Sequence, residues 1–246
     1  MSTITSPTAA HAQTGLRRPA LKTVAGVSLM LGGLLNGLPQ YLVELLAGDQ
    51  GDFSEQIRWS VNHSGAHQAE QLTILISSLF MPIGLLGVAW VAHHYARRLT
   101  VWATVLTVLG MWGFHNVLAM GYTTGTVGPA AIGVDDAVRL NDALVEDGGV
   151  IATALLPHLI GTFFGLLLLA IACWRTGAFP RVPLLLLVAF LVWDFALPSV
   201  GPLEPHLLLV ISWVWLGVHL LRMPTAVWFG DPVFAEQNRK GTAKSY

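Results

Sequence analysis

The chain has 246 residues, of which 54% are hydrophobic and only 11% are charged. An ordinary soluble domain carries about 25% charged residues, so this chain has too little charge to cover a soluble surface. The composition therefore excludes a soluble enzyme, a nucleic-acid-binding protein and a disordered chain, and it predicts a multi-pass membrane protein. The net charge of −1 excludes a strong overall electrostatic field. The single cysteine, Cys173, excludes an internal disulfide framework.

Six apolar segments are long enough to cross a membrane, because a hydrocarbon core about 30 Å thick needs roughly 20 helical residues. In chain order they are residues 23–47, 72–92, 101–122, 150–173, 183–201 and 203–221. The apolar runs are continuous, which favours helices over the alternating strands of a barrel. We therefore predict an all-α membrane protein, a bundle of six transmembrane helices over residues 23–222. Residues 1–22 are predicted to be a disordered cytoplasmic arm, and residues 223–246 a cytoplasmic tail.

The basic residues are distributed unevenly between the two predicted sides of the membrane. Of the 13 lysines and arginines, all but Arg58 and Arg139 flank the same side of the predicted spans. The positive-inside rule places that side in the cytoplasm, so both termini are predicted to be cytoplasmic. The expected location is the plasma (inner) membrane, as in bacterial-type multi-pass proteins. The chain is therefore expected to have the lipid bilayer as a partner.

Two predicted outer loops are long enough to contain structure of their own. Residues 52–61 carry Phe53, Ile57 and Val61 at helical spacing, and residues 134–147 carry a similar apolar stripe. Both segments are predicted to be short amphipathic helices over the outer mouth of the bundle. Plain loop closure is the alternative for each.

Polar side chains within the predicted spans give the only functional signal. Such groups are costly in hydrocarbon, so they usually face a cavity, a partner or a ligand. From these polar residues we predict an outward-facing ligand or proton pocket, formed by Glu44, His115, Asn116, His158, Asp194 and His206. Asn36 and Gln40 are further polar residues of the first span.

The ionisable members of this group are all predicted to lie in the outer half of the membrane. Carboxylates combined with imidazoles can bind a divalent metal, carry a proton or hold a small polar molecule. Because Asp194, His158 and His115 have similar predicted depths, we expect their side chains to lie within about 8 Å of one another, close enough for direct or water-bridged contact. The alternative is that these polar residues only pair between helices and specify packing.

A second cluster, His63, His67 and Glu70, precedes the second predicted span. On a helix these residues would share one face, with a spacing that zinc sites use. However, Ser64 and Gly65 lie between the histidines and weaken a helix there. A metal site is therefore one hypothesis for this cluster, and an exposed loop beside the membrane is the other.

The sequence contains no catalytic motif that would assign a reaction. It has no His-Glu-x2-His, Gly-x-Ser-x-Gly, Walker-type or Cys-x2-Cys motif. Two functions of different class remain. The first is a transporter-like protein or membrane enzyme that handles a small molecule, proton or metal ion. The second is an accessory or scaffold subunit that contacts another membrane protein or a second copy of itself.

Overall fold

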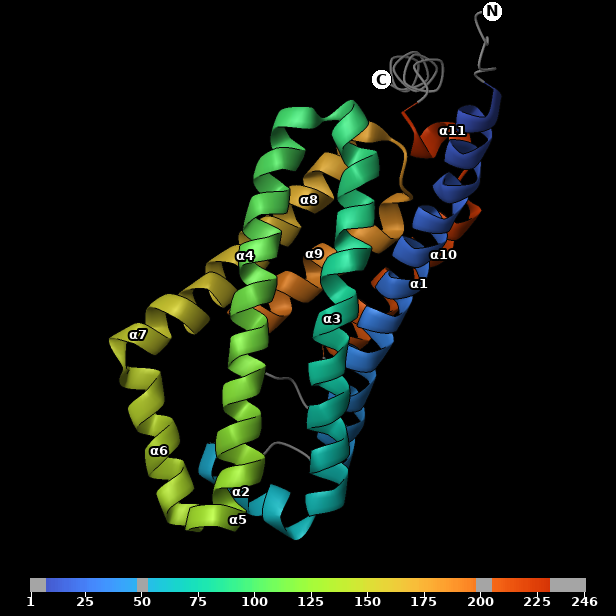
Figure 1. Ribbon diagram of the computed structural model, residues 1–246. Helices are drawn as coiled ribbons and strands as arrows, with labels where there is room; N and C mark the ends of the chain where they lie inside the picture. The colour runs from blue at the N-terminus through green and yellow to red at the C-terminus, as the bar shows by residue number, and fades with distance from the viewer. Residues whose placement is uncertain (1–7, 48–52, 198–204, 231–246) are drawn as a thin grey trace, which may run out of the picture.

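The computed structural model describes residues 8–47, 53–197 and 205–230 of the chain. Every regular element in these ranges is helical. The prediction of an all-helical protein is therefore confirmed for the described residues. The helices fall into two classes, long apolar helices and shorter ones that pack against them or cap one end (Figure 1).

Four helical stretches are long and apolar enough to cross a membrane. The first two are Ala20–Leu46 within α1 (Thr8–Ala47) and the whole of α3 (Ser64–Tyr95). The other two, Arg97–Ile132 and Gly148–Thr176, are each built from several helical segments.

The third and fourth stretches change helical type along their length. Arg97–Ile132 consists of α4 (Arg97–Tyr122), the π-helix η1 (Thr123–Val127) and α5 (Gly128–Ile132). The fourth stretch runs from α7 (Gly148–Val150) through the π-helices η2 (Ile151–Leu155) and η3 (Pro157–Thr162) to α8 (Phe163–Thr176). These π-helical segments were not predicted from the sequence.

The last two predicted spans correspond to shorter helices. Helix α9 (Arg181–Ala196) has 16 residues and α10 (His206–Arg222) has 17. At 1.5 Å per residue they are about 24 and 26 Å long, slightly less than the hydrocarbon thickness of about 30 Å. Six spans therefore remain a prediction.

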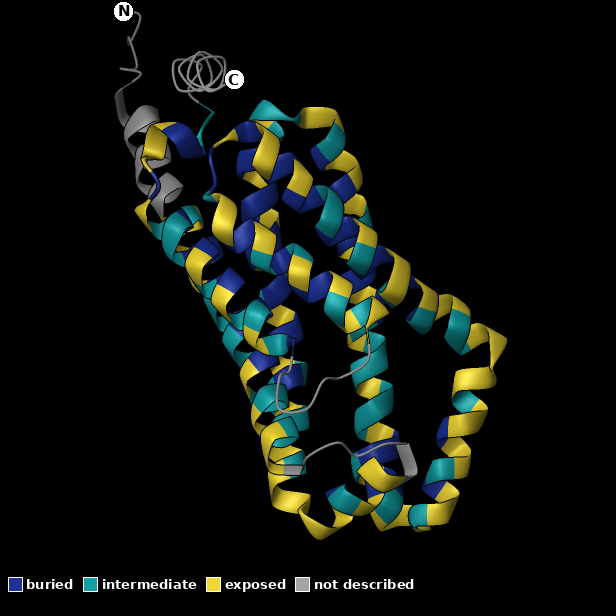
Figure 2. Cartoon of the chain, turned by 180° about the vertical axis from the view of Figure 1, so that it is seen from behind, coloured by how far each residue is buried: buried dark blue, intermediate teal, exposed yellow. Residues whose placement is uncertain are grey.

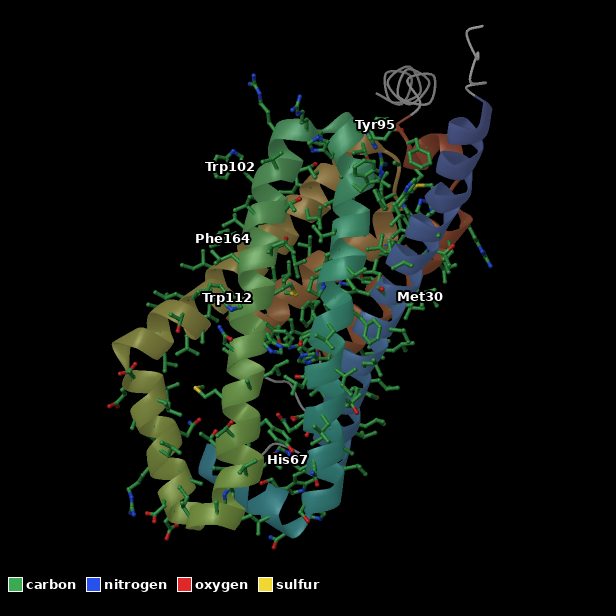
Figure 3. The ribbon with its side chains drawn as sticks, in the orientation of Figure 1. Met30, His67, Tyr95, Trp102, Trp112 and Phe164 are labelled. Atoms are coloured by element: carbon green, nitrogen blue, oxygen red, sulfur yellow. The ribbon has the colours of Figure 1, made fainter. Side chains whose placement is uncertain are left out.

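The long helices form a bundle in which α1 lies against both α3 and α10. Helix α4 packs on α3, η3 and α8, and α9 packs on α8 and α10. Leu29, Leu166 and Trp213 are among the side chains that are almost completely buried between these helices. Figure 2 shows that most buried positions lie in one half of the bundle. The labelled Trp102, Trp112 and Phe164 instead project away from the bundle, as expected of side chains that face lipid (Figure 3).

Glycines allow several helix pairs to approach until their backbones touch. A Cβ added at Gly33 or Gly37 would overlap atoms of α10, and one added at Gly161 or Gly165 would overlap the backbone of α4. Small residues four positions apart are the usual device for close packing of membrane helices. These glycines therefore fix how near α10 and η3 lie to their neighbours.

One end of the bundle, which we call the basic end, contains the α3–α4 turn, the α8–α9 connection and the last turn of α10 (Figure 1). The exposed arginines at these elements are Arg97, Arg98, Arg175, Arg181 and Arg222. Lys22 Nζ also donates a hydrogen bond of 2.8 Å to the Met223 carbonyl at this end. The basic residues that flank the same side of the predicted spans therefore lie at one end of the folded chain. That this end faces the cytoplasm remains a prediction.

The opposite end, which we call the far end, contains α2 (Phe53–Asn62), the start of α3, α5 and α6 (Val134–Glu146). Helices α2 and α6 cover most of the two stretches for which amphipathic helices are predicted, whereas Asp52 lies outside the described residues. Ser60 Oγ donates a hydrogen bond of 3.1 Å to the Gly125 carbonyl and thereby joins α2 to η1. The location of this end outside the cell remains a prediction.

Two described helices extend into the predicted flanking segments. Helix α1 begins at Thr8, inside the predicted disordered arm, because alanine, leucine and arginine are good helix formers and extend the apolar helix. The predicted tail contains α11 (Thr225–Trp228), and Trp228 is buried against α3. Trp90 Nε1 donates a hydrogen bond of 3.0 Å to the Trp228 carbonyl, which holds this segment in place. Residues 231–246 lie outside the described residues.

Candidate functional site

A pocket with a volume of about 160 Å³ lies among the helices α1, α3, α4, η3, α8, α9 and α10. Its lining combines aromatic walls with polar groups from four of these helices. The polar lining residues are Asn36, Gln40, His158, Thr162, Asp194 and His206, and the aromatic ones are Phe114, Phe190, Phe195 and Trp213. A small number of polar groups in an apolar wall is the usual composition of a small-molecule site.

The π-helix η3 carries two of the polar lining residues, His158 and Thr162. π-Helical turns are rare and are often found at functional sites. Two glycines of α4 allow η3 to lie directly against that helix, because a Cβ at Gly110 would overlap Thr162 and a Cβ at Gly113 would overlap His158. The imidazole is therefore held by a backbone that has little room to move.

His158 is surrounded by polar and aromatic partners. Its Nδ1 lies 3.2 Å from Thr162 Oγ1, within hydrogen-bonding distance. The centroid of its ring lies 5.1 Å from that of Phe114 and 5.9 Å from that of Phe195. These contacts fix the orientation of the ring at the pocket wall.

An amide pair from α1 also lines the pocket. Gln40 Nε2 donates hydrogen bonds to Asn36 Oδ1 at 2.7 Å and to the Asn36 carbonyl at 3.1 Å. Asn36 is almost completely buried, and its Nδ2 donates to Met81 Sδ at 3.5 Å. The pair presents a fixed polar surface, since both amides are held by neighbouring groups.

Trp213 is a pocket residue that was not predicted from the sequence. Its side chain has 0% exposure and lines the pocket, and Nε1 has no hydrogen-bond partner among the described residues. A buried donor without a partner costs about 1–3 kcal/mol, so this N–H lowers the stability of the folded state. The signal in the sequence was the position of Trp213 in the middle of an apolar helix, away from the interfaces that tryptophan prefers.

The two remaining polar groups lie where the shorter helices end and begin. Asp194 is in the last turn of α9 and is exposed, and His206 is the first residue of α10. The ring of His206 lies edge-on to Phe190, with 5.5 Å between centroids. Counted from Arg181 and Arg222, these residues lie about 20 and 24 Å along their helices. Both residues therefore lie at the ends of their helices that are remote from the basic end.

Three of the predicted site residues do not line this pocket. His115 Nδ1 makes a hydrogen bond of 2.8 Å with Ser78 Oγ on α3, and Asn116 Nδ2 donates one of 3.1 Å to the Thr153 carbonyl. Glu44 lies on α1 and is not part of the lining. Phe114 faces the pocket, and because each helical residue turns by about 100°, its neighbour His115 faces α3 instead. His158 and Asp194 thus line one pocket, and His115 is separate from it.

The structure also separates one member of the second predicted cluster, His63, from His67 and Glu70. Helix α2 ends at Asn62 and α3 begins at Ser64, so His63 stands at the junction and not on the helix that carries the other two. The His63 ring stacks on Trp59 with 4.6 Å between centroids, whereas His67 Nδ1 lies 3.3 Å from Glu70 Oε2. Figure 3 shows His67 in the far-end part of α3. Within the described residues, no three histidine, cysteine or acidic side chains are grouped so that they could hold a metal ion.

No protein-family model, no curated protein and no solved structure matches the chain.

Proposed function

We propose that the chain is a multi-pass membrane protein that binds a small polar molecule, an ion or a proton in the pocket between α1, η3, α9 and α10. Such a protein acts as a transporter or as a membrane enzyme. One observation carries the proposal: Asp194, His158 and His206, which come from three different helices, line a single pocket of about 160 Å³. Polar residues that only specified packing would be expected to fill the space between the helices, because protein interiors are close-packed.

The chemistry of the lining favours a ligand with few atoms and more than one polar group. The carboxylate of Asp194 accepts hydrogen bonds, and the imidazoles of His158 and His206 can donate or accept them. The volume of about 160 Å³ is smaller than that of sites for drug-sized ligands, which are about 300–1,000 Å³. The aromatic walls provide a low-dielectric surrounding in which each polar contact is stronger than in water.

The direction of access follows from the position of the pocket. Asp194 and His206 lie at the ends of α9 and α10 that point away from the basic end. With the arginine-rich end in the cytoplasm, the pocket opens toward the outside of the cell. We therefore propose a plasma-membrane protein whose pocket is reached from the outer side.

Two polar contacts outside the pocket are instead typical of residues that specify helix packing. His115 with Ser78 and Asn116 with Thr153 are polar contacts that join neighbouring helices. Each is satisfied by a protein partner, as expected when a polar group specifies helix packing. For these two residues we propose a packing role.

Binding can be tested by thermal unfolding of the purified full-length protein in the presence of small amines, carboxylic acids, amino acids and divalent metal ions. A ligand at 100 times its dissociation constant stabilises the folded state by about 2.7 kcal/mol and raises the Tm. We expect at least one compound to raise the Tm of the wild type and to lose this effect in Asp194→Asn and Trp213→Phe. His115→Gln is the control, because it alters a polar residue outside the pocket and should retain the full shift. Equal shifts in all four proteins would place binding elsewhere and contradict the proposal.

A further inference from the structure

A second hollow of the molecule lies at the basic end, on the surface between α3 and α4. It is an open groove with a volume of about 440 Å³, remote from the pocket described above. Leu86 and Trp90 line it on the α3 side, together with His93 in the last turn of that helix. Val101, Thr104 and Val105 line it on the α4 side. The groove lies between two helices that are long and apolar enough to cross the membrane, so it faces lipid.

The threonines of the groove do not make it polar. Thr100 Oγ1 donates to the Ala96 carbonyl at 3.0 Å, and Thr104 Oγ1 donates to the Thr100 carbonyl at 2.7 Å. Both hydroxyl groups are used within their own helix, so the methyl groups remain to cover the surface. The wall on the opposite side is fixed, because the Trp90 indole donates its N–H to the Trp228 carbonyl. The groove is therefore preformed and apolar.

Two arginines stand where the groove reaches the basic end. Arg97 precedes Val101 by four residues and Thr104 by seven, so it continues the same face of α4 by one turn. Arg98 follows it, and both side chains are exposed. Ion pairs among the described residues occur at His67–Glu70 and Arg139–Asp136, both at the far end, so no described carboxylate neutralises Arg97 or Arg98.

The start of α4 adds hydrogen-bond donors to this charge. Its N-cap residue is Ala96, which has no side chain to accept from the first backbone N–H groups of the helix. Uncapped N–H groups at a helix start favour an anion. Trp102 is 66% exposed one turn further on, as is typical of a side chain at the level of the lipid headgroups. An anion bound by Arg97 and the start of α4 would therefore lie at headgroup depth, next to the apolar groove.

We propose that this groove is a binding site for one anionic phospholipid, with an acyl chain along α3 and α4 and its phosphate at Arg97 and Arg98. The charge pattern selects an anionic headgroup over a zwitterionic one, since arginines near the membrane surface attract anionic lipid. The apolar groove selects a lipid over a free anion. The proposal is independent of the ligand pocket, because the two sites share no residue.

The test is lipid competition on the purified full-length protein in detergent. Mixed micelles containing equal amounts of phosphatidylglycerol and phosphatidylcholine are added, and retained lipids are counted by native mass spectrometry. We expect one phosphatidylglycerol to be retained with a preference on the order of tenfold over phosphatidylcholine, as two arginines imply. In Arg97→Gln/Arg98→Gln the preference should fall to about one.

Two further variants separate the charge from the groove. Val105→Trp fills the groove from a side chain that is 54% exposed, so it should abolish retention while leaving the Tm unchanged. Arg175→Gln removes an exposed arginine at the same end but outside the groove, and it should retain the wild-type preference. Retention that survives both Val105→Trp and the double arginine variant would overturn the proposal. Loss of retention on adding inorganic phosphate alone would also overturn it, because it would indicate a free-anion site.

Discussion

Gly161→Ala is expected to destabilise the protein by about 3 kcal/mol, the upper part of the range for overpacking a tight interior. The added methyl group would overlap the backbone of Gly110 on α4 and the carbonyl of Leu106. Backbone atoms cannot turn aside as a flexible side chain can, so η3 and α4 would have to separate. The change is measured as the unfolding free energy in mixed micelles, followed by tryptophan fluorescence.

Gly65→Ala is the matched control for this substitution. A Cβ at Gly65 has no atom within 4 Å, and the residue lies near the start of α3. Alanine favours a helix over glycine by up to about 1 kcal/mol, so this variant should be as stable as the wild type or more stable. Equal losses in the two variants would show that close contact between η3 and α4 does not hold the bundle together.

Trp213→Ala is expected to cost about 3–5 kcal/mol, the usual range for truncating a buried tryptophan. Trp213 is the largest completely buried side chain in the described part of the protein, and its ring forms part of the pocket wall. Trp213→Phe should cost much less, because it keeps a ring and removes a donor that has no protein partner. The same unfolding assay compares the two variants.

Trp215→Ala provides the control on the same helix. Its side chain is 44% exposed and leaves the core intact when it is removed, so the cost should stay below about 1 kcal/mol. If Trp213→Phe were as destabilising as Trp213→Ala, the indole N–H would have a protein partner. The expected difference between the two Trp213 variants would then be absent.

Hydropathy and charge were sufficient to predict the class of fold. Apolar runs identified the stretches that became α1, α3, α4 and α8, because burial in lipid demands long uninterrupted helices. The bounds were less accurate, since α3 begins eight residues before the predicted span at residue 72. That extension contains polar residues and lies at the far end, where hydropathy no longer determines where a helix starts.

The candidate pocket could be predicted only in part. Residue depth can be counted along a helix, so the sequence identified His158, Asp194 and His206, which line one pocket. The direction in which each side chain points depends on how the helices rotate against one another. For this reason His115 was grouped with them, although it faces Ser78. The π-helix η3 has no recognised signature in this sequence and was not predicted.

The central claim, a polar pocket open to the side opposite the arginines, is tested most directly by cysteine labelling. The chain has one cysteine, Cys173, which is completely buried and should not react. We predict that Thr162→Cys, at the pocket wall, reacts in intact cells with a membrane-impermeant thiol reagent, whereas the equally buried Thr107→Cys outside the pocket does not. Labelling of Thr162→Cys only from the cytoplasmic side, or equal protection of both cysteines, would contradict the account.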